Sequence, residues 1–309
     1  MYLLIYENVH IVSNDTGEVF ESYLDGVIYV QTEKEKELAR KHFKEKIPEL
    51  PPGEVKFAPA KEYEKRGGFI WNIHDNAKIL YPELRPASLT RLMFLATFLC
   101  YDGYLRDGRN PILRNTLGLY LNVGRREYFR FWSEMTSLGL MYEKDGKIYL
   151  NEDMFVKGSI CKDKIRDLAD KGVYITRIYS AAVRELYRSA TPSSIKTLSY
   201  LFRILPYVNR EYNICCFDPL ETDIRALTPM TLGDFADVVG YDRSSASRLA
   251  KILHTPVFEI DGKQMNAMRY VAANDTKAET YGMFINPRIY YAGSDWSKVE
   301  VLCGFNSAT

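Results

Sequence analysis

Five side chains close to residue 250 have the types and the spacing of a surface that binds nucleic acid. They lie on one face of the helix predicted at the end of the segment 231–253, "TLGDFADVVGYDRSSASRLAKIL". The face consists of Arg243, Ser244, Ser247, Arg248 and Lys251. Guanidinium, ammonium and hydroxyl groups donate hydrogen bonds to base edges and phosphates, and no acidic residue stands among them. We therefore expect contacts with duplex DNA here, with an ordinary solvated helix face as the alternative.

A second group of basic residues occurs in the helix predicted within residues 125–140, "RREYFRFWSEMTSLGL". Its candidate DNA-binding residues are Arg125, Arg126 and Arg130. Residues 105–134 contain six arginines and three acidic residues, a local net charge of +3 in a chain whose total is +1. Positive charge for nucleic acid must therefore be concentrated locally. Tyr120 stands where the second group has Ala236, so for the first group a DNA contact and a structural role are equally open.

The residue types that catalysis or metal binding would require are not found at suitable spacings. None of the four histidines has a second His or Cys at ligand spacing; they are His10, His42, His74 and His254. Residues 103–110, "GYLRDGRN", copy the glycine spacing of a phosphate-binding loop but lack its lysine and hydroxyl residues. The acidic segment 217–223, "FDPLETD", is more typical of a solvated loop than of a cation site. We expect no enzymatic activity, no metal and no cofactor.

Two pairs of segments repeat in the same order along the chain. Residues 146–159, "GKIYLNEDMFVKGS", match residues 281–294, "YGMFINPRIYYAGS", and residues 86–101 match residues 192–207. The aligned pairs include Pro86/Pro192, Ile148/Met283, Asn151/Asn286, Phe155/Tyr290 and Gly158/Gly293. Two ordered matches predict a duplicated structural unit. Each copy is expected to begin with a strand and a helix, and to end with a strand, an asparagine and a short aromatic tail.

Within each copy the predicted order is helix, helix, turn, helix and two-stranded hairpin, which is the order of a winged helix-turn-helix domain. In the second copy, Thr231 and Asp242 are expected to cap the two helices, with Gly240 in the turn between them. In the first copy, Asp145 and Gly146 are expected to form the hairpin turn.

The composition and the repeat together predict an α+β fold in three units. Apolar residues make up 46% of the chain, which is enough for folded cores. We expect a small α/β N-terminal unit with its linker at residues 1–66, a first winged helix at 67–160 and a second at 161–309. Both winged helices are expected to be mainly helical, with β-hairpins as wings.

The N-terminal unit is expected to contain strands at 2–13, 18–24 and 26–31, then a charged helix at 33–47 and an irregular linker at 48–68. The chain has no run of eighteen apolar residues and no basic leader at its start, so we expect a cytoplasmic protein without a membrane span. Its cysteines form no C-x-x-C pair and are expected to be reduced, structural thiols. They are Cys100, Cys161, Cys215, Cys216 and Cys303.

Residues 68–294 resemble the replication proteins of bacterial plasmids and phages, whose initiators carry two winged-helix domains in one chain. The resemblance rests on the helix 86–101, on the unit 231–253, and on "GKIYLN" and "GMFINP", each followed by an aromatic tail and Gly-Ser. Glu152 departs from the proline present at Pro287. The resemblance implies a protein that binds repeated double-stranded DNA sites at a phage or plasmid origin, does no chemistry itself and works beside other replication proteins.

Two alternatives stay open at this level. A transcriptional regulator, with transcription proteins as partners, would use the same helix on DNA, and a winged-helix module for protein contacts is favoured by the near-zero net charge. If both copies bind DNA, the chain is an internal pseudo-dimer, whether it is a monomer or a homodimer. Its two half-sites should differ in sequence and lie about one helical turn, roughly 34 Å, apart.

Overall fold

The computed structural model describes four short N-terminal strands and residues 68–299 apart from 75–76, 159, 161–165, 169, 174, 261, 273–280 and 294. The strands form two antiparallel pairs, β1 (Tyr2–Leu4) with β4 (Ile28–Val30) and β2 (Val9–Val12) with β3 (Val19–Ser22). The segment 2–13, predicted as one strand, therefore contains two. The helix predicted at 33–47 and nearly all of the predicted linker lie outside the described residues. Helices combined with small antiparallel sheets confirm the α+β class.

A four-stranded antiparallel sheet joins the two copies of the repeat. Its order is β10 (Phe155–Val156), β5 (Phe69–Ile73), β11 (Ile175–Tyr179) and β16 (Tyr290–Tyr291). The first two strands come from the first copy and the last two from the second. At the centre, Trp71 of β5 lies opposite Arg177 of β11. The two halves of the sheet are therefore related by an approximate twofold symmetry about the pair β5 and β11.

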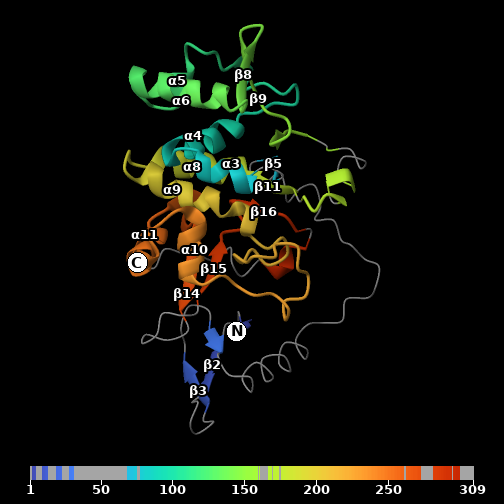
Figure 1. Cartoon of the computed structure of the whole chain (residues 1–309), viewed down its shortest axis with the longest axis vertical. Helices are drawn as coiled ribbons and strands as arrows, with labels where there is room; N and C mark the ends of the chain where they lie inside the picture. The colour runs from blue at the N-terminus through green and yellow to red at the C-terminus, as the bar shows by residue number, and fades with distance from the viewer. Residues whose placement is uncertain are drawn as a thin grey trace.

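Two pairs of helices follow the two central strands. They are α3 (Ala77–Glu83) and α4 (Pro86–Ala96) in the first copy, and α8 (Ser180–Ser189) and α9 (Ser194–Arg203) in the second. Pro86 occupies the first turn of α4, as predicted, where its missing N–H leaves no helical hydrogen bond unmade. In the middle of the molecule (Figure 1), α4 packs against α8 and α9. Thr90 Oγ1 donates a 2.9 Å hydrogen bond to the Ile195 carbonyl across this contact.

One hydrophobic core runs through both copies. It includes Ile70, Leu92 and Phe155 from the first and Ile178 and Leu201 from the second, all at most 2% exposed. Burial of apolar surface is the dominant favourable contribution to folding. Separating the copies would therefore expose core residues of both.

An asparagine closes each copy with the same hydrogen bonds. Asn151 and Asn286 each donate from the backbone N–H to one carbonyl and from Nδ2 to the carbonyl before it. The acceptors are Leu140 and Gly139 for Asn151, and Ala267 and Asn266 for Asn286, at 3.0–3.1 Å. The two aligned asparagines thus occupy equivalent positions in space.

The outer elements of the first copy lie at the top of Figure 1. In chain order they are β6 (Arg106–Asp107), β7 (Asn110–Pro111), α5 (Leu117–Tyr120), α6 (Arg125–Ser137), β8 (Met141–Lys144) and β9 (Lys147–Leu150). Asp145 and Gly146 join β8 to β9 with φ angles of 50° and 69°, which confirms the predicted hairpin turn.

The outer elements of the second copy begin, after the short 3-10 helix η1 (Leu205–Tyr207) and a long loop, with helices. In chain order they are α10 (Leu232–Val239), η2 (Arg243–Ser245), α11 (Ala246–Leu253), β12 (Val257–Ile260), β13 (Lys263–Asn266), β14 (Met268–Ala272), β15 (Tyr281–Ile285) and, after β16, η3 (Trp296–Lys298). The hairpin β14–β15 ends at Asn286 as β8–β9 ends at Asn151. The hairpin β12–β13 is an insertion that the sequence comparison did not predict.

Candidate nucleic-acid interface

The helix α6 has one face in the core and a basic face toward solvent. Phe131 and Met135 are fully buried and Trp132 nearly so. The exposed residues of α6 include Arg125, Arg126 and Arg130. All three predicted arginines therefore lie outside the core.

The acidic residues of α6 are paired with cations of the adjoining helix α4 and the residue before it. Glu127 Oε1 accepts a 2.6 Å hydrogen bond from Arg91 Nη1, and Glu134 Oε2 accepts one of 2.8 Å from Arg85 Nε. Burial acts to raise the pKa of Glu127, but the hydrogen bond and charge of Arg91, together with the charges of Arg85 and Arg130, hold that pKa below its usual value. Glu127 also lies 3.7 Å from Arg130. The two carboxylates are therefore largely neutralised from inside.

Two of the α6 arginines have no ionic partner among the described residues. Arg125 lies over the Phe129 ring, 5.7 Å from its centroid, and Phe129 is itself 48% exposed. Arg126 makes no ion pair with any described residue. Exposed arginine next to an exposed aromatic ring suits phosphates and bases, since guanidinium groups bind the former and stack on the latter.

The first copy resembles the second more closely than the sequence comparison indicated. Leu117 begins α5 and Leu232 begins α10, and both are buried. Each follows a threonine and precedes a glycine. Pairing Leu117 with Leu232 shifts the alignment of the two copies by one residue from the one that paired Tyr120 with Ala236. The helix of the first copy is also shorter than that of the second.

Two lysines near α6 were missed by sequence analysis, and Arg114 was counted only in the local charge of residues 105–134. Lys144 and Lys147 flank the β8–β9 turn, and Lys147 Nζ lies 4.5 Å from the Tyr104 ring centroid. Arg114 lies 5.0 Å from the Trp132 ring and 3.3 Å from Glu143. The lysines on either side of Asp145-Gly146 were the available signal for the first two.

The second copy has the predicted helix ends around α10. Thr231 accepts a hydrogen bond from the Asp234 N–H while Asp234 accepts from the Thr231 N–H, a reciprocal cap. Gly240 has a φ of 73°, a left-handed conformation that favours glycine. The predictions for Thr231 and Gly240 are confirmed.

The predicted polar face of 243–251 requires a correction. Arg243 and Ser244 lie in η2, and α11 begins only at Ala246. Arg243 Nη1 lies 2.5 Å from Asp237 and 3.6 Å from Asp234, so acids of α10 pair with it. Asp242 does not cap α11, whose N-cap is Ser245.

Asp242 instead binds the residues of η2. It accepts hydrogen bonds from the Ser244 N–H (3.0 Å) and Ser244 Oγ (2.6 Å). This local bonding competes with a regular helix and explains why the helix starts later than its sequence pattern indicated.

Two of the remaining predicted residues are exposed on α11. Arg248 and Lys251 are both exposed and have no ionic partner among the described residues. Ser247 belongs to α11, while its side chain lies outside the described part of the structure. The free positive charge of the second copy is thus smaller than predicted.

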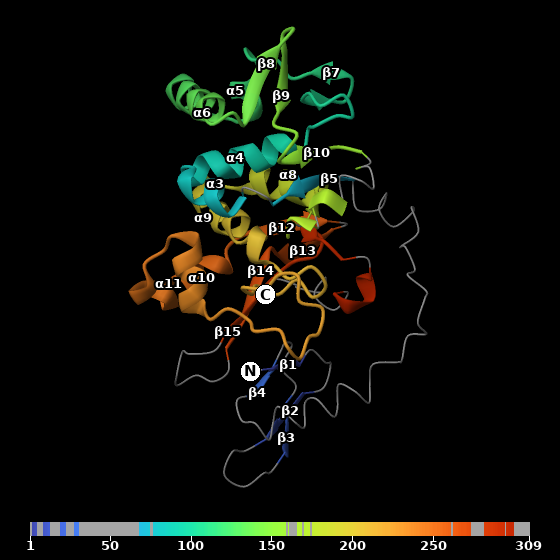
Figure 2. The same cartoon turned by 45° about the vertical axis from the view of Figure 1, so that its right-hand side comes forward.

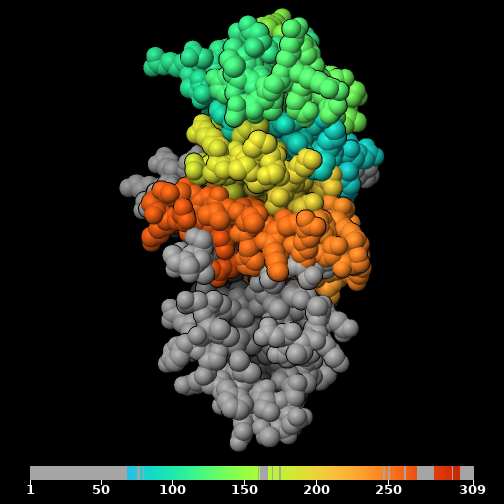
Figure 3. All heavy atoms as spheres, turned by 90° about the vertical axis from the view of Figure 1, so that its left-hand side faces the viewer, coloured from blue at the N-terminus to red at the C-terminus, as the bar shows by residue number. Residues whose placement is uncertain are grey.

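The helices α6 and α11 lie toward the same side of the molecule. Both are on the left in Figures 1 and 2, above and below the layer that contains α9. Figure 3 faces this side and shows the first copy above and the second below. One extended ligand could therefore reach both copies from this side.

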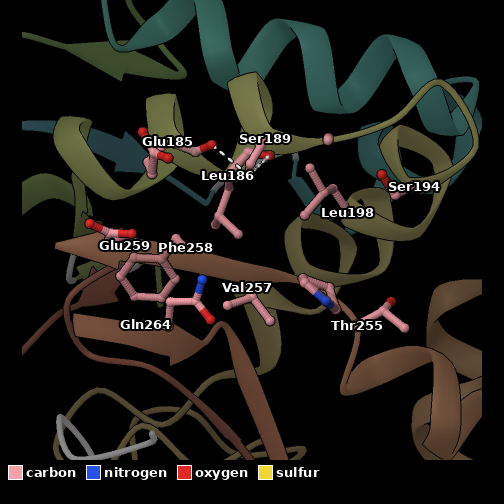
Figure 4. A pocket seen from close by; sticks show the side chains of 12 residues that line it. Glu185, Leu186, Ser189, Ser194, Leu198, Thr255, Val257, Phe258, Glu259 and Gln264 are labelled. Atoms are coloured by element: carbon pink, nitrogen blue, oxygen red, sulfur yellow. Dashed lines mark hydrogen bonds between the residues drawn. The ribbon is translucent and has the colours of Figure 1, made fainter. Parts of the chain in front are cut away.

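A hollow of about 270 Å³ lies between α8, α9 and the inserted strand β12. Leu186, Leu198 and Val257 line it, and the carboxylates of Glu185 and Glu259 lie at one end (Figure 4). Two carboxylates without a lining cation would repel a phosphate. This hollow is therefore not part of a nucleic-acid surface.

The residues that the sequence analysis rejected as metal or catalytic sites make structural contacts. His74 Nε2 lies within hydrogen-bond distance of Thr176 Oγ1 (3.1 Å) and the Tyr290 hydroxyl (3.0 Å) in the core. In the acidic loop, Asp223 pairs with Arg225 at 2.8 Å. Across the described residues, no three His, Cys, Asp or Glu side chains are grouped as metal ligands. Cys100, Cys215 and Cys216 are buried free thiols, as predicted.

No protein-family model, curated protein or solved structure matches this chain. None of the helices within the described residues has the length and apolar character needed to cross a membrane.

Proposed function

We propose that the chain is a sequence-specific duplex DNA-binding protein in which two winged helices act together, and that its target is a phage or plasmid replication origin. In this proposal α4, α5 and α6 with the hairpin β8–β9 form the first winged helix. The second consists of α9, α10 and α11 with the hairpin β14–β15. The helices α6 and α11 enter the major groove.

The observation that carries the proposal is the separation of charge around α6. Its acids Glu127 and Glu134 are held by Arg91 and Arg85, whereas Arg125 and Arg126 have no described ionic partner. A helix arranged in this way presents net positive charge to solvent in a chain that is nearly neutral. Arginine is the side chain that most often recognises guanine in the major groove, and it also binds phosphates.

The second copy contributes a weaker surface in this proposal. Arg248 and Lys251 remain available, but Arg243 is paired with Asp237. We therefore expect the first copy to supply most of the affinity, which reverses the ranking suggested by the sequence alone. Because the exposed residues of α6 and α11 differ, the two half-sites should differ too.

The central sheet is evidence that α6 and α11 are held in a fixed relative position. β5 and β11 pair directly, and α4 packs on α9, so the two copies cannot rotate independently without breaking these contacts. A second contact made by an already bound chain is intramolecular, which can raise the combined affinity 10²- to 10⁴-fold over either copy, an order-of-magnitude range.

The proposal is tested by selecting duplexes from a random pool with the full chain, then measuring affinity by fluorescence anisotropy at several salt concentrations. Arg126→Gln should weaken binding and either lower the log–log salt slope by about 1 or relax preference at one base pair. Arg210→Gln is the matched control, because Arg210 is exposed but lies outside α6 and α11.

Equal binding by the wild-type chain and Arg126→Gln, or failure of the wild-type chain to enrich any duplex, would refute the DNA-binding proposal. The origin assignment has a separate test. A replicon that lacks its own initiator but carries the selected duplex should be maintained in cells that express the wild-type chain, and lost with Arg126→Gln. Maintenance without the chain would refute the replication role.

A further inference from the structure

A second, smaller cavity lies where the two copies meet. It has a volume of about 190 Å³. Arg106 and Lys157 of the first copy and Ser180 and Arg184 of the second are among its lining residues. In Figure 2 the strands β7 and β10 of this region lie to the right, whereas α6 and α11 lie to the left. The cavity is therefore separate from the candidate DNA surface.

Its cations are held in position by backbone and aromatic groups. Arg184 donates from Nη2 to the Thr97 carbonyl (2.6 Å) and from Nε to Thr97 Oγ1 (2.9 Å), and lies 3.9 Å from the Phe98 ring centroid. Lys157 Nζ donates to the Phe69 carbonyl at 2.7 Å. Arginine has five N–H donors and lysine three, so each retains donors beyond these bonds.

The cavity has no carboxylate among its lining residues. Asp107 is the acid whose charge acts on Arg184, and it is exposed outside the lining. Arg106 has no ionic partner among the described residues. Burial, and then the charge of Arg184, lower the pKa of Lys157. Lys157 and Arg184 repel each other, and the opposing charge of Asp107 lies outside the lining, so an anion bound between the two cations would relieve their repulsion.

A buried hydroxyl adds a neutral donor. Ser180 is 6% exposed, and its Oγ has no hydrogen-bond partner in the structure. A buried hydroxyl without a partner is costly, and such groups usually mark a place where a ligand or water completes the bonding. Ser180 also begins α8, where the helix dipole favours negative charge.

We propose that this cavity is a binding site for a phosphate-sized oxyanion, held by Arg106, Lys157 and Arg184 with Ser180 as an additional donor. The volume exceeds that of a single water, whose share of the liquid is about 30 Å³, and suits a compact anion. The shared chemistry is the phosphate group, whether inorganic, carried by a small ester or part of a nucleic-acid backbone.

The ligand would join the two copies. Arg106 and Lys157 belong to the first copy and Ser180 and Arg184 to the second, so a bound anion contacts both sides of their junction. A ligand that binds only the folded state stabilises it by RT ln(1 + L/Kd), where L is the concentration of free ligand, so the stabilisation grows with that concentration. Bound phosphate would therefore strengthen the junction between the copies, whether or not the chain binds DNA.

The test is calorimetric titration of the full chain with inorganic phosphate, with potassium chloride at the same ionic strength as reference. Wild-type protein should bind phosphate saturably, and Arg106→Gln and Lys157→Gln should each weaken binding about tenfold or more, since each removes a charge-assisted hydrogen bond. Arg210→Gln is the matched control, because Arg210 is an exposed arginine outside the lining of the cavity.

Competition experiments distinguish the three possible sources of the bound phosphate group. Displacement of phosphate by ribose 5-phosphate identifies a small ester, displacement by a duplex of random sequence identifies a backbone phosphate, and phosphate alone identifies the free ion; each supports the site. Absence of saturable phosphate binding overturns the proposal. So does an equal loss of phosphate affinity in Arg210→Gln and Arg106→Gln, since that outcome would reflect the net charge of the protein and not this site. Arg106 has no described side-chain partner, so its variant should fold normally.

Discussion

Trp71 and Arg177 lie opposite each other at the centre of the sheet, and each donates a 2.8 Å hydrogen bond to the carbonyl of the glycine near the end of its own copy. The acceptor is Gly158 for Trp71 Nε1 and Gly293 for Arg177 Nη1. The Arg177 guanidinium also lies 5.0 Å from the Trp71 ring. The two copies thus meet through unlike residues in equivalent positions, which gives a cation–π contact that two identical residues could not form.

Arg177→Ala should destabilise the whole described fold and not only the second copy. The substitution removes the bond to Gly293 and the contact with Trp71, and the expected loss is about 1–3 kcal/mol. Urea denaturation followed by tryptophan fluorescence measures it. Arg109→Ala, at the exposed tip of β6–β7, should change the free energy of unfolding little. Equal stability of the two variants would show that the central pair contributes nothing.

Gly240→Ser should cost stability, whereas Gly124→Ser should not. Gly240 has a φ of 73°, and a Cβ there would also lie 3.1 Å from Arg203 Nη1. A left-handed non-glycine residue costs about 1–2 kcal/mol. Gly124 has a φ of −68° at the N-cap of α6, where serine is favoured. Thermal melts of both variants test the contrast, and a lower melting temperature for Gly124→Ser alone would contradict it.

Stability should fall with pH below about 6.5 because of His74. Burial, and then the charge of Lys78, lower the pKa of His74 to about 3. His74 takes up a proton near pH 6.5 in the unfolded chain but not in the folded chain. Between pH 6.5 and 3, protonation therefore stabilises the unfolded state relative to the folded state. The loss is about 1.4 kcal/mol per pH unit in this window, or about 2 kcal/mol at pH 5.

His74→Gln isolates this effect, because every other titrating group is retained. Denaturation curves at pH 7.5 and pH 5 should differ by about 2 kcal/mol less in the variant than in the wild-type chain. An identical pH dependence in both proteins would show that His74 is accessible to protons in the folded state.

Asp237→Asn should strengthen DNA binding, if the proposed function is correct. Asp237 is the nearer of the two acids that pair with Arg243 beside α11. Replacing it leaves Arg243 with only the longer contact to Asp234 and removes a negative charge from the proposed DNA surface. Anisotropy titrations at low salt measure the change, with Asp218→Asn in the distant acidic loop as the control. Unchanged affinity in Asp237→Asn would mean that η2 lies outside the DNA contact.

The sequence by itself determined the features that depend on neighbouring residues. Pro86 in the first turn of α4, the Asp145–Gly146 turn and the Thr231 cap were all predicted and are present. Each depends on backbone dihedral angles or on a bond that spans three residues, so a short window of sequence contains the whole cause. The repeated asparagines were visible for a related reason, because both copies need the same local bonds to end the hairpin.

Only the tertiary structure decided which charges are available to a ligand. Glu127 lies 36 residues from Arg91 in sequence, yet a 2.6 Å hydrogen bond joins them in the structure. This pairing offsets a negative charge that, in the sequence alone, counted against the positive charge of α6. Conversely, Asp237 of α10 removes Arg243 from the face where the helical pattern had put it. Coulomb energy depends on the distance between charges and on their exposure to water, and neither follows from sequence spacing once two helices pack together. For the same reason, the cavity lined by Arg106, Lys157 and Arg184 could not be predicted from the sequence. These residues come together only when the two copies pair along β5 and β11.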